Sequence, residues 1–285
     1  MKKKSILICL FLLLLLSAIF CFLVNQKSKQ KQSNVNDLCF LKTYGSINYV
    51  DNQSNSIDIA FVSSSSINFA KEVITLSFDN PNVSCDDIVI KKSFSYGQYT
   101  LWYLQFDIII DTSKLETNNI ELHKLSLNNY TNKDLGNLAI RIIKGDNNLF
   151  SNLKLQSCTG ASMSTKLSDY HAELKNICTN SLFIDSVEIP MYNNATFSFT
   201  VDNVNYTDLN KLEIKPKQDI QFSVSLSDCF VDSVNVYYVS PLLTYHDNVS
   251  NQDTCIAFNY YTSGLNITKE QLASIVNEFM EEKIE

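Results

Sequence analysis

The residues that could carry chemistry in this chain are histidines with acidic neighbours. Asp169 and Glu173 lie close to His171 in the sequence, and Asp247 directly follows His246. A histidine beside a carboxylate can act as a general base that the carboxylate orients. With 30 acidic residues in the chain, chance neighbours on the surface are the more frequent origin of such a pair. We therefore expect neither histidine to be catalytic.

Sequence motifs for catalysis and for cofactors are missing. The segment from Ser162 to Tyr170, which ends in Ser168-Asp169-Tyr170, resembles fragments of the penicillin-recognising serine enzymes. It lacks their Ser-x-x-Lys, since Lys166 lies three residues after Met163, and the chain has no Lys-Thr-Gly. The chain has only 6 glycines and no nucleotide-binding loop. His123 has no second histidine or cysteine at metal-ligand spacing. We predict no cofactor, no metal and no catalytic residue.

Six cysteines follow the first 24 residues, and their even number suits an oxidising compartment. None forms a C-x-x-C pair, so a zinc site or a redox dithiol is not expected. We predict disulfides, with Cys39–Cys85 as the first pair, supported only by the even count in each half. The alternative is a set of buried free thiols. The candidate cysteines are Cys39, Cys85, Cys158, Cys178, Cys229 and Cys255.

Aromatic residues gather at two places, and exposed rings there could stack on sugars or anchor a protein partner. The alternative, which we favour for each single ring, is packing in the core or between strands. The two groups are Tyr96, Tyr99, Trp102 and Tyr103, and then Tyr237, Tyr238, Tyr245, Tyr260 and Tyr261.

The charge of the chain is divided unevenly. The first 32 residues hold six of the 23 basic residues and no acid, so the rest has 17 basic residues against 30 acidic ones, about −13 in formal charge. Such a body repels phosphate groups. This excludes nucleic acid as a partner and argues against flat binding to anionic lipid.

The N-terminus predicts a membrane anchor. Three lysines precede an apolar run from Ile6 to Val24, which as a helix matches the thickness of a bilayer core. The run is longer than a typical signal-peptide core, and it lacks small residues at a cleavage site. A cleaved signal peptide is one alternative, and a lipoprotein modified at Cys21 is another. We expect the rest of the chain to lie outside the cytoplasm.

The remaining sequence alternates between short apolar strands and turn residues, which is typical of β-sandwiches. The clearest strand runs from Tyr99 to Asp111, where Trp102, Leu104 and Phe106 begin one apolar face. We predict an all-β fold of one or two sandwiches. The expected segments are a transmembrane helix at 1–24, a flexible tether at 25–38, a first sandwich at 39–148, a second sandwich at 149–264 and a C-terminal helix at 265–285.

The segment from Leu212 to Leu226 is a strand, a proline turn and a strand. It resembles a hairpin of bacterial membrane-anchored immunoglobulin-like extracellular domains, where the turn often reads Pro-Gly; here Lys217 follows Pro216. The likeness extends loosely upstream, from Glu173 through Val187. It implies an immunoglobulin-like sandwich used for adhesion, carbohydrate binding or spacing. It carries over no site residue.

The C-terminal segment predicts an amphipathic helix. Thr268 and Gln271 form a capping box, and five apolar residues follow on one face. We expect this face to pack on its own sandwich, and docking of a partner is the alternative. The stripe is Leu272, Ile275, Val276, Phe279 and Met280.

These observations together predict a membrane-tethered extracytoplasmic protein that serves as an interaction or spacer module at the cell surface. Its ligand would be a protein or a carbohydrate. One alternative is an exported cell-envelope hydrolase whose site is assembled from distant residues. Another is an accessory subunit of a membrane complex.

Overall fold

The structure is a computed structural model that describes residues 38–50, 55–143, 152–160, 167, 169–249, 254–258 and 260–281. Cys39–Glu285 form one compact unit. The described part consists of strands, one α-helix and three short 3-10 helices, so the expected all-β class is confirmed. The 3-10 helices are η1 (Phe69–Lys71), η2 (Thr112–Lys114) and η3 (Leu209–Lys211).

The expected anchor helix at 1–24 and all but the last residue of the expected tether lie outside the described residues. Within the described part, no helix is long and apolar enough to cross a bilayer. The expected boundary at residue 148 also lies outside the described residues and stays a prediction.

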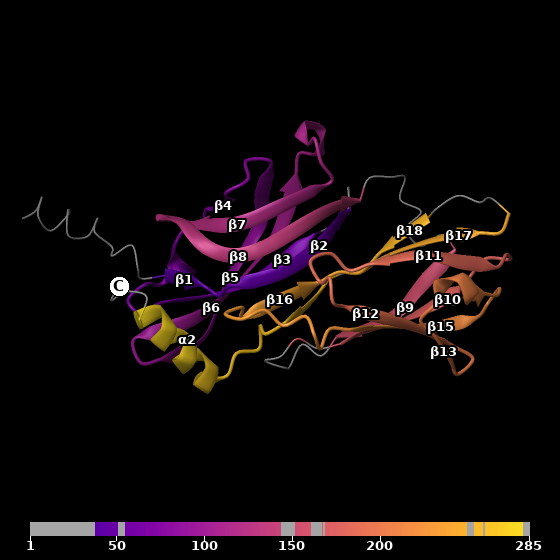
Figure 1. Ribbon diagram of the computed structural model, residues 1–285. Helices are drawn as coiled ribbons and strands as arrows, with labels where there is room; N and C mark the ends of the chain where they lie inside the picture. Colours follow the sequence, from indigo (N-terminus) through magenta and orange to yellow (C-terminus); the bar gives the residue numbers. More distant parts are fainter. Residues whose placement is uncertain are drawn as a thin grey trace, which may run out of the picture. The chain divides into compact units, whose positions relative to one another are not determined.

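Two sheets form a sandwich in the first half of the chain (Figure 1). One sheet has the order β1-β3-β6-β5, and the other contains β2-β8-β7-β4. The bounds of the first sheet are β1 (Leu38–Phe40), β3 (Ser56–Ser64), β6 (Tyr99–Ile110) and β5 (Val83–Tyr96). Those of the second are β2 (Thr43–Val50), β8 (Tyr130–Ile143), β7 (Asn119–Leu127) and β4 (Leu76–Phe78).

Strand β6 shows why this sandwich forms. Alternate residues of a strand point to one face, and the predicted apolar face of β6 is buried along its whole length. Trp102 packs edge-on against Phe69 and parallel to Phe61, and its indole N–H donates to Ser63 Oγ at 3.0 Å. The buried residues of this face are Trp102, Leu104, Phe106, Ile108 and Ile110.

A second sandwich follows in the chain. One of its sheets has the order β13-β12-β15-β10-β9, and the facing sheet has the order β14-β11-β17-β18. Its core contains Phe222 stacked between Phe199 and Phe258, with ring centroids 4.9 and 5.5 Å away. The first sheet is β13 (Val204–Tyr206), β12 (Thr196–Val201), β15 (Asp219–Ser225), β10 (Tyr170–Asn176) and β9 (Leu153–Gly160). The facing sheet is β14 (Glu213–Ile214), β11 (Leu182–Glu188), β17 (Leu242–Asp247) and β18 (Thr254–Ala257).

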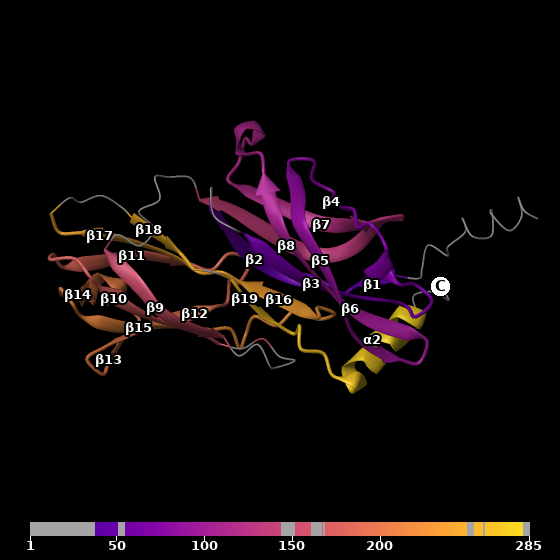
Figure 2. The ribbon, with the colours of Figure 1, turned by 180° about the vertical axis from the view of Figure 1, so that it is seen from behind.

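The two sandwiches share a segment of chain. β16 (Val236–Val239) pairs in parallel with β2, and β19 (Tyr261–Ser263) pairs with β16, so both strands extend a sheet of the first sandwich (Figures 1 and 2). Only Ser240 and Pro241 separate β16 from β17, which lies in the second sandwich. One nearly continuous strand therefore belongs to both bodies.

Buried and partly buried polar contacts reinforce this junction. The Tyr44 hydroxyl donates to Met191 O at 2.8 Å, and the Tyr192 hydroxyl donates to Tyr238 O at 2.9 Å. The Asn48 amide donates to Pro241 O at 3.0 Å. Burial raises the pKa of the Tyr192 phenol well above its usual value, and that of Tyr238 as well. These phenols therefore stay neutral donors at any ordinary pH.

The proline turn of the Leu212–Leu226 segment is present, but its strands do not form a hairpin. β14 pairs with β11, whereas β15 pairs with β10 and β12, so the turn crosses from one sheet to the other. Lys217 has φ of 63°, the region that glycine adopts most easily. Lys217, which follows Pro216 in this turn, thus has a glycine-like backbone.

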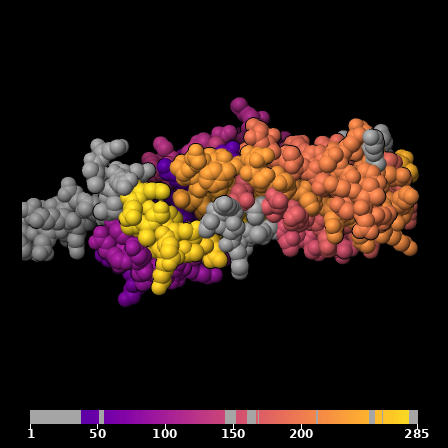
Figure 3. Space-filling view, turned by 60° about the horizontal axis from the view of Figure 1, so that its bottom comes forward, coloured from indigo at the N-terminus to yellow at the C-terminus, as the bar shows by residue number. Residues whose placement is uncertain are grey.

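The C-terminal helix α2 (Lys269–Glu281) is confirmed together with its capping box. The Gln271 side chain accepts from Thr268 N–H at 2.7 Å, and Gln271 N–H donates to Thr268 Oγ1 at 3.3 Å. In Figure 3 the helix, drawn in yellow, lies against the purple surface of the first sandwich. The chain reaches it through Leu265, whose carbonyl accepts from the Tyr103 hydroxyl of β6 at 2.6 Å.

Candidate functional site

The structure does not arrange His171 as a catalytic base. Its Nδ1 lies 2.9 Å from Ser223 Oγ on the exposed face of β10 and β15. Asp169 instead accepts from Leu226 N–H at 3.0 Å, and Glu173 accepts from Ser157 Oγ at 3.0 Å. No carboxylate hydrogen-bonds to His171 among the described residues, so its serine contact lacks the orienting group that activates a nucleophile.

His246 does have a carboxylate partner. Its Nδ1 lies 2.7 and 2.9 Å from the two oxygens of Asp185, and its ring stacks on Phe183. Asp185 sits where the pairing register of β11 with β17 shifts, and such bulges re-aim side chains. Within the described part of the chain, no hydroxyl or thiol is hydrogen-bonded to the ring. The pair is a histidine–carboxylate contact to which the described residues add no nucleophile.

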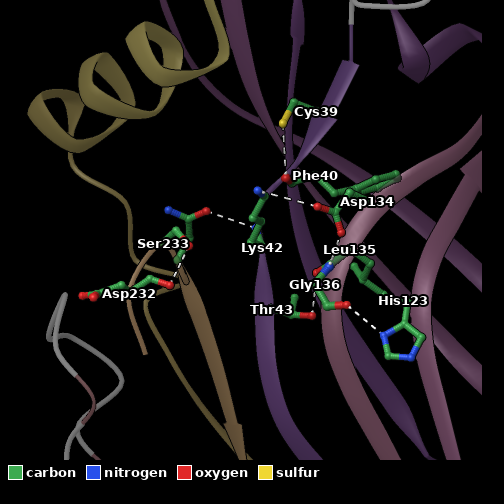
Figure 4. A network of polar contacts seen from close by, with 11 residues as sticks. Cys39, Phe40, Lys42, Thr43, His123, Asp134, Leu135, Gly136, Asp232 and Ser233 are labelled. Carbon is green, nitrogen blue, oxygen red and sulfur yellow. Dashed lines mark hydrogen bonds and ion pairs between the residues drawn. The ribbon is translucent and has the colours of Figure 1, made fainter. Parts of the chain in front are cut away.

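His123 belongs to a polar network at the start of β2 (Figure 4). Its Nδ1 lies 3.3 Å from Gly136 O, and its Nε2 lies 3.4 Å from a Glu121 oxygen. In the same network Thr43 Oγ1 donates to Leu135 O at 2.8 Å. These contacts join β2, β7 and β8 and have a structural role. Across the described ranges, no group of three metal-ligating side chains could hold an ion.

The structure contains none of the expected disulfides among the described residues. The predicted Cys39–Cys85 pair is not formed in this structure, because these residues lie on β1 and β5, the opposite edges of one sheet. Three strand spacings of about 4.8 Å separate these edges, and a disulfide tolerates about 7 Å between Cα atoms. An even cysteine count carries no information about which strands are neighbours.

The thiols differ in accessibility, which gives a first testable prediction. Cys158 is exposed, whereas burial raises the pKa of Cys85 to about 12. At pH 8 only about one Cys85 in 10,000 is then the reactive thiolate. We expect iodoacetamide to modify Cys158 at least 100-fold faster than Cys85 in the native protein, as followed by peptide mass mapping.

Denatured protein is the control for this measurement. There all six described cysteines should react without prior reduction. A pair that reacts only after reduction would contradict the free-thiol assignment, and equal native rates at Cys85 and Cys158 would contradict the burial of Cys85.

Most rings of the predicted aromatic clusters pack in the core and are not exposed for ligand binding. Tyr237, Tyr238 and Tyr245 are at most 1% exposed, and Trp102 is 2% exposed. The Tyr238 hydroxyl donates to Asp58 O, which attaches β16 to β3. Of the first cluster, Tyr96 is 45% exposed. These rings form no shared binding platform.

The apolar stripe of α2 faces its own chain where the structure describes it. Leu272 and Val276 are buried, and Ile275 is half-buried beside a hollow of about 180 Å³. The side chains of Phe279 and Met280 lie outside the described part. Leu272 and Val276 are therefore not available to a partner.

One polar concave surface was not identified by the sequence analysis. It is a hollow of about 380 Å³ on the outer face of the sheet β13-β12-β15-β10-β9, which we call the polar hollow. Figure 3 brings the lower side of Figure 1, where these strands lie, towards the viewer. Its lining consists of Gln156, Glu173, Thr200, Asp202, Asn203, Asp219, Ile220 and Gln221.

Strand pairing places the central side chains of the polar hollow in one row. Gln221 is paired with Thr200 on one side and with Glu173 on the other, and Glu173 is paired with Ser157. Side chains in such a row stand about 5 Å apart and point the same way. The alternation of polar and apolar residues in β10, β12 and β15 was the available sequence signal. It gives the outward face of each strand but not the strand order.

Comparisons with known proteins add little. No family model matches the chain, and no curated protein matches it. One matching solved structure is described as the crystal structure of a protein of unknown function from Porphyromonas gingivalis W83. It is 13% identical, the match covers 80% of this chain and 97% of that chain, and the TM-score is 0.22. A likeness this weak leaves fold and function to be argued from the chain itself.

Proposed function

We propose that this protein is a membrane-tethered, extracytoplasmic pair of immunoglobulin-like sandwiches that serves as a rigid interaction or spacer module at the cell surface. The observation that carries the proposal is the strand shared by the two sandwiches. β16 pairs with β2 of the first body and continues through Pro241 into β17 of the second. Two domains joined in this way cannot swing freely about a linker, which suits a spacer or a presenting arm.

The immunoglobulin-like part of the proposal rests on strand order. An immunoglobulin sandwich has strands A-B-E-D in one sheet and C-F-G in the other. In the second body, β9-β10-β15-β12 reproduces the first order and β11-β17-β18 the second, if β13, β14 and β16 are additions. In the first body, β1-β3-β6-β5 and β4-β7-β8 fit the same scheme, with β2 added beside β8.

The site geometry favours an interaction module over an exported hydrolase. His171 contacts a serine but no carboxylate, and His246 contacts a carboxylate but no nucleophile within the described part. Burial of Leu272 and Val276 likewise weighs against a complex subunit that docks through α2. Support for the membrane anchor is the apolar run from Ile6 to Val24.

Membrane topology tests this proposal. We expect the full chain to remain in the membrane fraction after an alkaline carbonate wash. We also expect protease added to intact cells to remove residues beyond the anchor. The variant with Leu13→Lys and Leu15→Lys should lose membrane retention, because each charge at the centre of a span costs about 3 kcal/mol.

A cytoplasmic marker protein that survives the same digestion is the control. A protected body would refute the extracytoplasmic location. A mature N-terminus between residues 20 and 38, found by intact-mass analysis, would refute the anchor.

A further inference from the structure

We infer that the polar hollow is a binding site for carbohydrate, specifically for an uncharged oligosaccharide chain. This inference deepens the proposed function and rests on it, because it assigns a ligand class to the interaction module. Four strands and one turn bring the hydrogen-bond donors and acceptors of this site together.

Each carboxylate of the polar hollow has a side-chain partner. Ser157 Oγ donates to Glu173 at 3.0 Å, Gln218 Nε2 donates to Asp202 at 2.7 Å, and Lys175 Nζ lies 3.1 Å from Asp219. A carboxylate has about four lone-pair positions, so each retains acceptor capacity for a ligand. Strand pairing sets the backbone positions of Glu173 and Asp219, which lowers part of the entropic cost of binding.

Three further side chains of the polar hollow have unused hydrogen-bonding capacity. Thr200, Asn203 and Gln221 form no side-chain hydrogen bond with the described residues. Asn203 projects from the β12–β13 turn, where Asp202 and Asn203 have φ of 49° and 65°, as in a tight two-residue hairpin. A hydroxyl and two amides can each donate and accept.

The same lining argues against apolar, anionic and metal-ion ligands. Its only apolar member, Ile220, is 2% exposed, so no apolar surface awaits a hydrophobic ligand. Three carboxylates and no lysine or arginine line it, so phosphate and other anions are repelled. No metal-ligand cluster occurs in the described part.

A ligand that fits must donate to carboxylates and accept from amides along a row. The hydroxyl groups of a sugar do both, and a chain of sugars can follow the row Thr200–Gln221–Glu173. Because no aromatic ring lines the hollow, stacking adds nothing, and we expect affinities in the high micromolar to millimolar range.

Titration calorimetry with the full chain tests the inference, in a detergent without a sugar head group. The probes are the hexasaccharides of cellulose, xylan, mannan, starch and chitin. We expect at least one to bind, with an affinity about tenfold weaker for Gln221→Ala and for Glu173→Gln. The matched control is Ser225→Ala, on the same strand and face but outside the hollow, and it should bind as the parent does.

Two results would overturn the inference. One is the absence of sugar binding at this site. It would be seen either as no binding of any of the five probes at 10 mM, or as binding that Gln221→Ala and Glu173→Gln leave unchanged. The other is that spermine binds in a manner abolished by Glu173→Gln while no sugar does, which would make the hollow a site for cations. Either result leaves the proposed function standing if the topology experiment succeeds, since protein partners would remain.

Discussion

Replacing Gly45 by alanine should lower the melting temperature of this protein by about 10 °C. Gly45 lies in β2 with φ of 135°, a conformation that residues with a Cβ rarely adopt. A Cβ there would lie 1.9 Å from Tyr238 O and 2.6 Å from Tyr192 Oη. Both neighbours belong to the junction of the two sandwiches, so the methyl group forces β16 away from β2.

The size of this effect follows from two contributions. Backbone strain of this kind costs about 1–3 kcal/mol, and overpacking costs about 1–3 kcal/mol. For a domain of this size, 1 kcal/mol shifts the melting temperature by about 2–4 °C. Differential scanning calorimetry measures both the shift and any division of the transition into two.

Gly97→Ala is the matched control for this substitution. Gly97 also has positive φ, 57°, in the β5–β6 turn, but a Cβ there meets nothing within 4 Å. This variant carries the backbone penalty of about 1 kcal/mol without the clash. Equal shifts for Gly45→Ala and Gly97→Ala would show that the close approach of β2 and β16 does not contribute to stability.

Ending the chain after Gly264 should lower the melting temperature by roughly 5–10 °C. The truncation removes Ile267, Leu272 and Val276, which are at most 6% exposed, and it removes the acceptor of the Tyr103 hydroxyl. Each buried side chain contributes about 1.5–3 kcal/mol, and the entropy of ordering the segment offsets a good part of the sum. We expect a net loss of about 3 kcal/mol.

Two controls separate packing from mere shortening. A chain that ends after Glu281 keeps α2 entire and should melt as the parent does. Leu272→Ala should cost about 2–3 kcal/mol, because undocking of the whole helix limits the loss, whereas Asn277→Ala, on an exposed position of the same helix, should cost under 1 kcal/mol. If the chain ending at Gly264 melts like the full one, intramolecular packing of the helix is wrong.

The local pattern of the sequence determined the elements that depend only on near neighbours. β6 was predicted from alternation, because side chains of a strand face the core at every second residue. α2 was predicted from its capping box and apolar stripe, since both are set within four residues along the chain. The acidic net charge of the chain beyond its first 32 residues also follows from the composition alone, without knowledge of the fold.

The local sequence pattern did not predict short strands or strands that are buried on both faces. β2 (Thr43–Val50) was not predicted. Most residues of β2 are buried, on both faces of the sheet, so the strand does not alternate between apolar and polar residues. β17 (Leu242–Asp247) was missed for the same reason, as three of its six residues are buried and Leu242 and Leu243 are adjacent.

Tertiary structure alone decided how the strands are ordered, and with it everything that concerns function. The pairing of β16 with β2 joins segments from opposite ends of the chain, and no local pattern encodes it. Strand order also separated Cys39 from Cys85 and brought Thr200, Gln221 and Glu173 into one row. The physical reason is that side-chain alternation specifies which way a residue faces, whereas its neighbours across the sheet are chosen by backbone hydrogen bonds between distant segments, to which every residue type except proline contributes alike.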